Sequence, residues 1–334
     1  MDRLLGLVIL SFFITAALVV PFINLLYKVK FRRTKELSKG QNNDRPEFDK
    51  MHKHKVGTPV GGGLLVIFVT VLLASILPAT MGYEVGVRLF CLIFALVGFG
   101  TLGLYDDIHK FFKFKQSGRW GLKMRWKFAL QWVLGIFIGY LLYSVEGFDN
   151  VYVPLLGNFH LGFAYIFYAA FVIVAFSNAF NITDGLDGLA GGLLVICLLG
   201  FLVIASSLVD PTLQVFLGIW IGSLFAFLYF NVYPARFWMG DVGALAFGAA
   251  LGVVALLTAK VLAVVVIGGV FIIELLSSGT QIASKKFLKR KLWPIAPMHL
   301  WLQRIGWEEP KIVMRLWLIG AIFAMFGVWL SAIK

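Results

Sequence analysis

Long runs of apolar residues dominate the chain and are separated by polar connections. A helix needs roughly 20 apolar residues to cross the hydrocarbon core of a bilayer. The pattern therefore predicts an all-α polytopic membrane protein with about ten transmembrane helices. The predicted spans lie at residues 4–27, 60–80, 86–105, 128–145, 163–181, 189–208, 212–230, 242–259, 261–283 and 312–332.

The spans are distributed along the whole chain, which predicts one integral membrane domain over residues 1–334. The first span has no small-residue cleavage site, so we expect a retained helix rather than a removed signal peptide. The segment VYVPLLGNFHLG, residues 151–162, alternates in polarity and has Gly-Asn near its middle, which predicts a short hairpin.

Composition supports the membrane assignment, because 60% hydrophobic and 14% charged residues lie outside the range of soluble domains. Both cysteines, Cys91 and Cys197, fall inside apolar spans. They are typical of small buried hydrophobic residues and not of a disulfide or a metal pair.

The basic residues indicate the orientation of the chain. Residues 28–58, 106–127, 231–241 and 284–311 hold 25 of the 30 Lys and Arg residues, and these loops share one side if ten spans alternate. Cytoplasmic loops carry the positive excess, so both termini are expected to be extracytoplasmic. The positive loops also suit anionic lipid headgroups, and no segment resembles a nucleic-acid-binding module.

Three polar segments end or join spans on this predicted cytoplasmic side. They are GLYDDIHK at 103–110, SNAFNITDGLDGLAGG at 177–192 and FNVYPARFWMGDVG at 230–243. Their aspartates could meet Lys55, Lys127 and His299 from other loops at one site. Carboxylates with lysines suit Mg²⁺ and phosphate, since Mg²⁺ binds through one or two carboxylates and substrate phosphates.

Each segment also has a structural interpretation. Asp106 and Asp107 could be charges at a helix end beside Lys110. Asp184 and Asp187 could share a helix face, or cap the helix that follows Gly188. A single histidine in a loop, such as His299, is more often structural than catalytic.

Taken together, these segments resemble the phospho-N-acetylmuramoyl-pentapeptide transferase family, within the polyprenyl-phosphate sugar-phosphate transferase superfamily. KVGTPVGGG at 55–63, GLKMRWKFALQ at 121–131 and GWEEPKIVMRLW at 306–317 also fit, in the right order from Lys55 to Trp317. The resemblance implies a ten-helix fold in the bacterial inner membrane. It implies transfer of phospho-MurNAc-pentapeptide from UDP-MurNAc-pentapeptide to undecaprenyl phosphate, with Mg²⁺, giving lipid I and UMP for peptidoglycan synthesis.

The resemblance also implies roles by motif position. Asp241 is expected to bind Mg²⁺, with Asp106 and Asp107 at the lipid phosphate or the metal, and Trp238 stacked on uracil. The implied catalytic residues are Asp106, Asp107, Asp241 and His299, and the implied metal ligands are Asp241, Asp107 and Asp184. The implied substrate-binding residues are Lys55, Lys127, Asn178, Asn181, Asp184, Gly185, Leu186, Asp187, Asn231, Trp238 and Gln281.

Several positions depart from the family pattern. Of three consecutive histidines that usually follow Ala-Pro, only His299 is present, and Leu300 and Trp301 take the next two positions. Gln303 stands where glutamate is usual, and Trp238 replaces a phenylalanine. These departures keep open a sibling enzyme that uses UDP-N-acetylhexosamine. A transporter is disfavoured because the carboxylates gather at one surface, and the sequence does not decide between a monomer and a homodimer.

Overall fold

The computed structural model describes residues 2–32, 55, 57–83, 85–111, 124–153, 156–259 and 261–333. Most residues of the two basic connections predicted at 28–58 and 106–127 lie outside these ranges. Within them, nine helices are long and apolar enough to cross a membrane. These are α1 (Asp2–Lys28), α4 (Gly62–Thr80), α5 (Val87–Phe111), α6 (Met124–Ser144), α7 (Tyr165–Thr183), α8 (Leu189–Ser207), α9 (Pro211–Asn231), α10 (Gly240–Leu257) and α14 (Glu309–Ala332).

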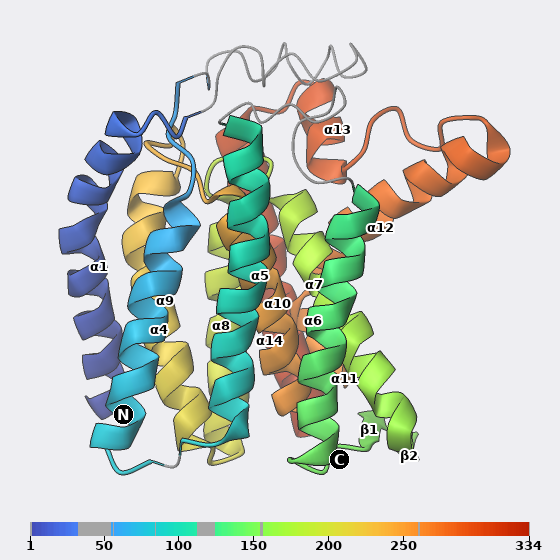
Figure 1. Ribbon diagram of the computed structural model, residues 1–334. Helices are drawn as coiled ribbons and strands as arrows, with labels where there is room; N and C mark the ends of the chain where they lie inside the picture. The colour runs from blue at the N-terminus through green and yellow to red at the C-terminus, as the bar shows by residue number, and fades with distance from the viewer. Residues whose placement is uncertain are drawn as a thin grey trace.

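The tenth predicted span, 261–283, is divided into two shorter helices, α11 (Val261–Ile267) and α12 (Gly269–Ala283). A side chain at Gly269 could not fit, because its Cβ would lie 2.5 Å from the Phe323 ring of α14. The division lies at Gly268, the N-cap of α12, and the apolar pattern continues across it. Beyond the break, α12 leaves the bundle and projects to the right in Figure 1.

Helix α10 lies at the centre, where it packs mainly against α5 and α7. Every residue from Val242 to Leu257 is buried. Glycines let neighbouring backbones approach its first turn closely, as small residues do in membrane helix pairs. A Cβ at Gly103 of α5 would lie 2.2 Å from the Asp241 carbonyl oxygen, and one at Gly63 of α4 would lie 2.2 Å from the Gly243 Cα.

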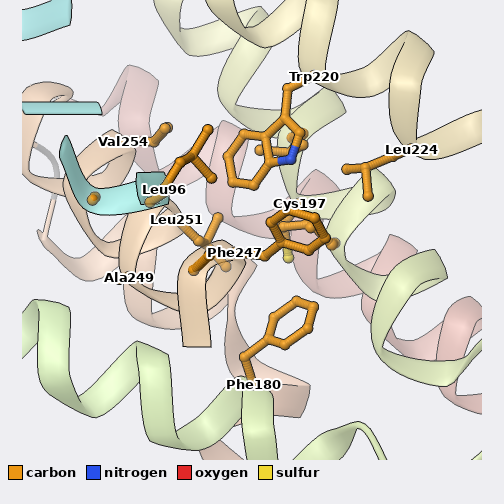
Figure 2. Packing of buried hydrophobic residues seen from close by; sticks show 14 of the residues in the cluster. Leu96, Phe180, Cys197, Trp220, Leu224, Phe247, Ala249, Leu251 and Val254 are labelled. Carbon is orange, nitrogen blue, oxygen red and sulfur yellow. The ribbon is translucent and has the colours of Figure 1, made fainter. Parts of the chain in front are cut away.

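Aromatic rings link helices α7, α9, α10 and α12 through the core. Figure 2 shows the rings that come from α7, α9 and α10. Trp220 of α9 packs against Phe247 of α10 with ring centroids 5.7 Å apart. Phe180 of α7 contacts Phe247 edge-on at 6.2 Å and stacks on Phe271 of α12 at 5.1 Å. Such pairs add to the stabilisation from apolar burial, and they join the end of α7 and the middle of α10 to α9 and α12.

The predicted hairpin is confirmed as strands β1 (Asn150–Val153) and β2 (Gly157–His160), paired antiparallel from Asn150–His160 to Val153–Gly157. Gly157 and Asn158 begin the second strand and do not form the turn. In Figure 1 the hairpin and both chain ends lie at the lower end of the bundle. Two short helical elements, a π-helix at Ser284–Leu288 and α13 (Met298–Arg304), follow α12. Helix α13 lies at the opposite, upper end.

Candidate active site

Two lysines and two aspartates from three helices form a cluster at the end of the bundle where α5 ends and α6 and α10 begin. The Lys110 Nζ lies 2.8 Å from Asp106 Oδ2 and 2.9 Å from Asp241 Oδ2. The Lys127 Nζ lies 2.9 Å from Asp106 Oδ2 and also pairs with Asp241 Oδ2. Because Lys110, Lys127 and Asp241 stay partly exposed, we call these four residues the open cluster.

Local sequence explains the geometry of the open cluster. Asp106 and Lys110 are four residues apart and share a face of the last turns of α5. Asp241 lies in the first turn of α10, directly after Gly240, whose φ of +79° is in the region that favours glycine. A Cβ at Gly240 would also lie 2.8 Å from Asp107 Oδ2. The Gly-Asp sequence therefore allows the close approach of α5 to the start of α10.

Asp107 has a different neighbourhood from Asp106. Its Oδ2 accepts a hydrogen bond of 3.1 Å from the Val242 backbone N–H, and the residue is only 2% exposed. An acceptor at this position satisfies one of the free N–H groups of the first turn of α10. Asp107 therefore holds the helix that carries Asp241.

A second group of charges is almost fully buried. The Lys55 Nζ lies 2.7 Å from Asp187 Oδ1 and 2.5 Å from Glu309 Oε1. Glu309 Oε1 also accepts the Asp187 backbone N–H at 2.6 Å, and the Trp238 indole N–H donates to Asp187 Oδ1 at 3.1 Å. We call Lys55, Asp187 and Glu309 the closed cluster. It joins the start of α14 to the loop between α7 and α8.

Asp184 lies in the α7–α8 loop and is electrostatically coupled to both clusters. Burial, with the negative charges of Asp241 and Asp187, raises the pKa of Asp184 to about 7, and Lys55 opposes this rise. A carboxylate whose charge is disfavoured in this way is stabilised by a nearby cation. The position suits a divalent cation or a cationic group more than an unpaired carboxylate.

The same loop contacts His299 of α13. His299 is 1% exposed, and both its backbone N–H and its Nδ1 lie 3.1 Å from the carboxylate oxygens of Glu274. A Cβ at Gly185 would lie 2.5 Å from His299 Nε2, so glycine is required for the ring to sit against the loop. Glu274 is thus the partner that fixes the imidazole, which explains a carboxylate deep in α12.

Several predicted substrate residues also hold the structure together. Asn178 donates to Gln131 Oε1 at 2.7 Å, whereas the buried Nε2 of Gln131 lacks a partner among the described residues. Asn231 accepts the Gly188 N–H at 3.2 Å and donates to the Phe237 carbonyl at 3.0 Å. Gln281 binds the backbone of Leu292 and Trp293, at the projecting end of α12.

The structure brings most of the predicted residues to one end of the bundle. Lys127 and Asp241 belong to first helical turns and His299 to α13, and none of them to a loop, which corrects the expectation from sequence. Of the two structural alternatives for Asp184 and Asp187, neither is found: both residues lie between α7 and α8, and the N-cap of α8 is Gly188, with no side-chain hydrogen bond. The expected site residues at this end are Lys55, Asp106, Asp107, Lys127, Asn178, Asn181, Asp184, Gly185, Leu186, Asp187, Asn231, Trp238, Asp241 and His299.

Sequence reasoning missed Glu309 and the Glu274–His299 pair. Glu309 lies in the first turn of α14 after a basic and polar connection, where an acidic residue usually only complements the helix dipole. Glu274 was the clearer signal, because a buried carboxylate inside an apolar span requires a partner. The position of Glu274 in the sequence did not identify this partner.

Asp241 and Asp184 are the candidate protein ligands for Mg²⁺. Among the described residues there is no group of three His, Cys, Asp or Glu side chains arranged to hold a metal ion. Mg²⁺ needs only one or two carboxylates when substrate phosphates and water complete its shell. Asp241, with Asp184 close enough to feel its charge, fits that requirement, and lysine ammonium groups now neutralise Asp241.

Comparisons with known proteins identify the family of the chain. The family model described as glycosyl transferase family 4 matches residues 89–259. The chain is 36% identical to a phospho-N-acetylmuramoyl-pentapeptide-transferase of Geobacillus sp. (strain WCH70), over 97% of this chain and 96% of that protein. It is 35% identical to the enzyme of the same name from Borreliella burgdorferi (strain ZS7), over 96% of this chain and 93% of that protein. The chain therefore belongs to the phospho-N-acetylmuramoyl-pentapeptide transferase family, within glycosyl transferase family 4.

Proposed function

We propose that this protein transfers phospho-MurNAc-pentapeptide from UDP-MurNAc-pentapeptide to undecaprenyl phosphate, giving lipid I and UMP, at the cytoplasmic face of a bacterial inner membrane. The observation that carries the proposal is the open cluster, in a chain that matches relatives of that name over nearly its full length. Lysines and carboxylates from α5, α6 and α10 meet where the bundle ends, within reach of a membrane-anchored phosphate.

The nucleophile needs little activation. A phosphate monoester has a second pKa near 6, about that of phosphorylated side chains, so the lipid phosphate is largely ionised at neutral pH. Its oxygen attacks the phosphorus bonded to the sugar, and the bond from that phosphorus to the bridging oxygen of UMP breaks. Catalysis then depends on positioning and on neutralising charge. Lys110 and Lys127 supply two ammonium groups 2.8–2.9 Å from Asp106, and they can turn toward phosphate oxygens.

Mg²⁺ would be held by Asp241, with Asp184 and Asp107 as the further candidate ligands. When bound, it would neutralise charge on the diphosphate and on the leaving UMP. The raised pKa of Asp184 supports this proposal, because a cation beside the carboxylate would stabilise its charged form. Asp107 has less freedom, since it accepts the Val242 N–H.

The nucleoside would bind along the α7–α8 loop, beside Gly185, Leu186 and Asp187. Trp238 is half-buried there, and its indole is held by the hydrogen bond to Asp187. Lys55 Nζ lies over the Trp238 ring, 5.6 Å from its centroid. A uracil would therefore stack on the opposite face of the indole, and the closed cluster would fix the ring for it.

His299 would border the sugar and peptide, with its ring held by Glu274. Leu300 and Trp301, in place of the usual second and third histidines, give this edge a more apolar character. The UDP-N-acetylhexosamine enzyme is the second candidate, and this departure is the observation that favours it. The match over 97% of the chain favours the muramoyl substrate.

One assay separates the two candidates. Purified protein is mixed with undecaprenyl phosphate, Mg²⁺ and either UDP-MurNAc-pentapeptide or UDP-GlcNAc, and UMP release is measured. We expect release with the muramoyl substrate alone. Release only with UDP-GlcNAc would overturn the assignment, and loss of release after chelation with EDTA would support the Mg²⁺ requirement.

A further inference from the structure

The end of α12 carries a compact basic segment outside the helical bundle. Residues 284–293, which we call the basic turn, comprise the π-helix and the five residues after it. Five of its ten residues are basic and all five are exposed: Lys285, Lys286, Lys289, Arg290 and Lys291. None of them belongs to the open or the closed cluster.

The basic turn has a fixed backbone. Gln281 Oε1 accepts the N–H groups of Leu292 and Trp293 at 3.0 and 2.9 Å, and its Nε2 donates to the Trp293 carbonyl at 2.9 Å. Ser284 Oγ donates to the Arg290 carbonyl at 2.8 Å. Gln281 and Ser284 are both buried, so these bonds close the turn onto the end of α12. The basic side chains are thus presented on a preorganised scaffold.

Large apolar side chains alternate with the basic ones. Phe287 is 74% exposed, Leu288 59% and Leu292 50%, and Ile282 just before the turn is 65% exposed. Trp293 is also exposed, and its indole N–H donates to the Thr280 hydroxyl at 3.1 Å. In Figure 1 the turn projects sideways from the bundle at the level of the upper end of α5. That is the height at which a membrane interface would lie.

We propose that the basic turn is a docking surface for anionic lipid headgroups of the surrounding bilayer. The exposed apolar side chains enter the boundary between headgroups and acyl chains, as in interfacial amphipathic segments. The five cations then face the lipid phosphates. Charge complementarity selects the partner, because a zwitterionic surface offers no net attraction to five positive charges. The occupant is bulk anionic lipid and not the polyprenyl phosphate substrate.

The docking surface can be tested with a fluorophore on the turn. Cys91 and Cys197 are both buried, so Leu288→Cys offers an accessible thiol for labelling. The labelled protein is placed in lipid nanodiscs that contain a headgroup quencher on either phosphatidylglycerol or phosphatidylcholine, at equal amounts. We expect severalfold stronger quenching by phosphatidylglycerol at low salt, because one basic residue near an anionic surface is worth about a five-fold change in affinity.

Two variants of the basic turn and one control variant, all in the Leu288→Cys background, sharpen the test. Changing all five basic residues to glutamine should bring the quenching ratio close to one, whereas changing the four lysines to arginine should preserve it. Lys28→Gln with Lys30→Gln removes basic charge at the end of α1 and is the matched control, which should keep the ratio. Circular dichroism checks that each variant is folded.

Three results would overturn the proposal. Equal quenching by both lipids in the parent protein would show no anionic preference. An unchanged ratio in the folded glutamine variant would show that the basic turn is not its source. Loss of the phosphatidylglycerol preference on adding an equimolar amount of undecaprenyl phosphate would mean that the turn binds the lipid substrate instead.

Discussion

The open and closed clusters contain the same chemical groups and differ in exposure. In the open cluster the side chains of Lys110, Asp241 and Lys127 are 32%, 22% and 18% exposed, and only that of Asp106, at 5%, is buried. In the closed cluster those of Lys55, Asp187 and Glu309 are 3–6% exposed. The open cluster pairs two lysines with two carboxylates, whereas the closed cluster pairs one lysine with two carboxylates.

This difference suggests different roles. Ions that keep contact with water can exchange partners at low cost, so the open cluster can release its lysines to incoming phosphate groups. Breaking a buried ion pair leaves an uncompensated charge in a medium of low dielectric, so the closed cluster resists rearrangement. We infer that the open cluster performs chemistry, while the closed cluster keeps the α7–α8 loop and Trp238 in place.

The largest expected effect is on turnover in the open cluster. Asp241→Asn removes a charged oxygen ligand for a hard cation but keeps the shape of the side chain, so we expect kcat to fall by about 10³-fold, ~4 kcal/mol, with the fold intact. UMP release at limiting and saturating Mg²⁺ measures it. Near-normal kcat under both conditions would exclude Asp241 as the metal ligand.

A change in the closed cluster should act on stability first. Glu309→Ala leaves Lys55 paired with Asp187 but removes the acceptor of the buried Asp187 N–H, so we expect a loss of roughly 1–3 kcal/mol in unfolding free energy. Thermal unfolding in detergent measures the loss as a lower Tm. Glu309→Gln is the matched control, because it keeps an acceptor and should lower Tm less. An unchanged Tm for Glu309→Ala would contradict the structural role.

Lys127→Gln is expected to lower activity and to leave stability almost unchanged, the reverse of Glu309→Ala. Lys110 still pairs with both Asp106 and Asp241, and Asp241 also keeps contact with water, so the Tm should stay close to that of the parent protein. The lost ammonium group should lower kcat/KM by about 10²-fold, since charge neutralisation is the main contribution to phosphoryl transfer. Parallel measurements of Tm and UMP release give the comparison. A large fall in Tm with unchanged kcat/KM would reverse the roles of the two clusters.

The sequence predicted the apolar helices well because span length and polarity are local properties. It did not predict the break between α11 and α12, because the apolar pattern continues across Gly268 and Gly269. The aspartates of the open cluster were recognisable from their motifs. The partners Glu309 and Glu274 were not, since each contact joins segments distant in sequence: Glu309 of α14 meets Lys55, and Glu274 of α12 meets His299 of α13.

The smallest effect sharpens the link between the closed cluster and the nucleotide. Base–aromatic stacking is worth roughly 1–3 kcal/mol per base, so Trp238→Ala should raise KM for the UDP substrate about five-fold to a hundred-fold. Trp238→Phe keeps an aromatic face but loses the N–H that donates to Asp187, so its effect should be mild. KM is measured for each substrate in turn. A tryptophan that only anchors the loop near the headgroups would affect both substrates. If Trp238→Ala changes KM for undecaprenyl phosphate and leaves that of the nucleotide substrate unchanged, the stacking role is wrong.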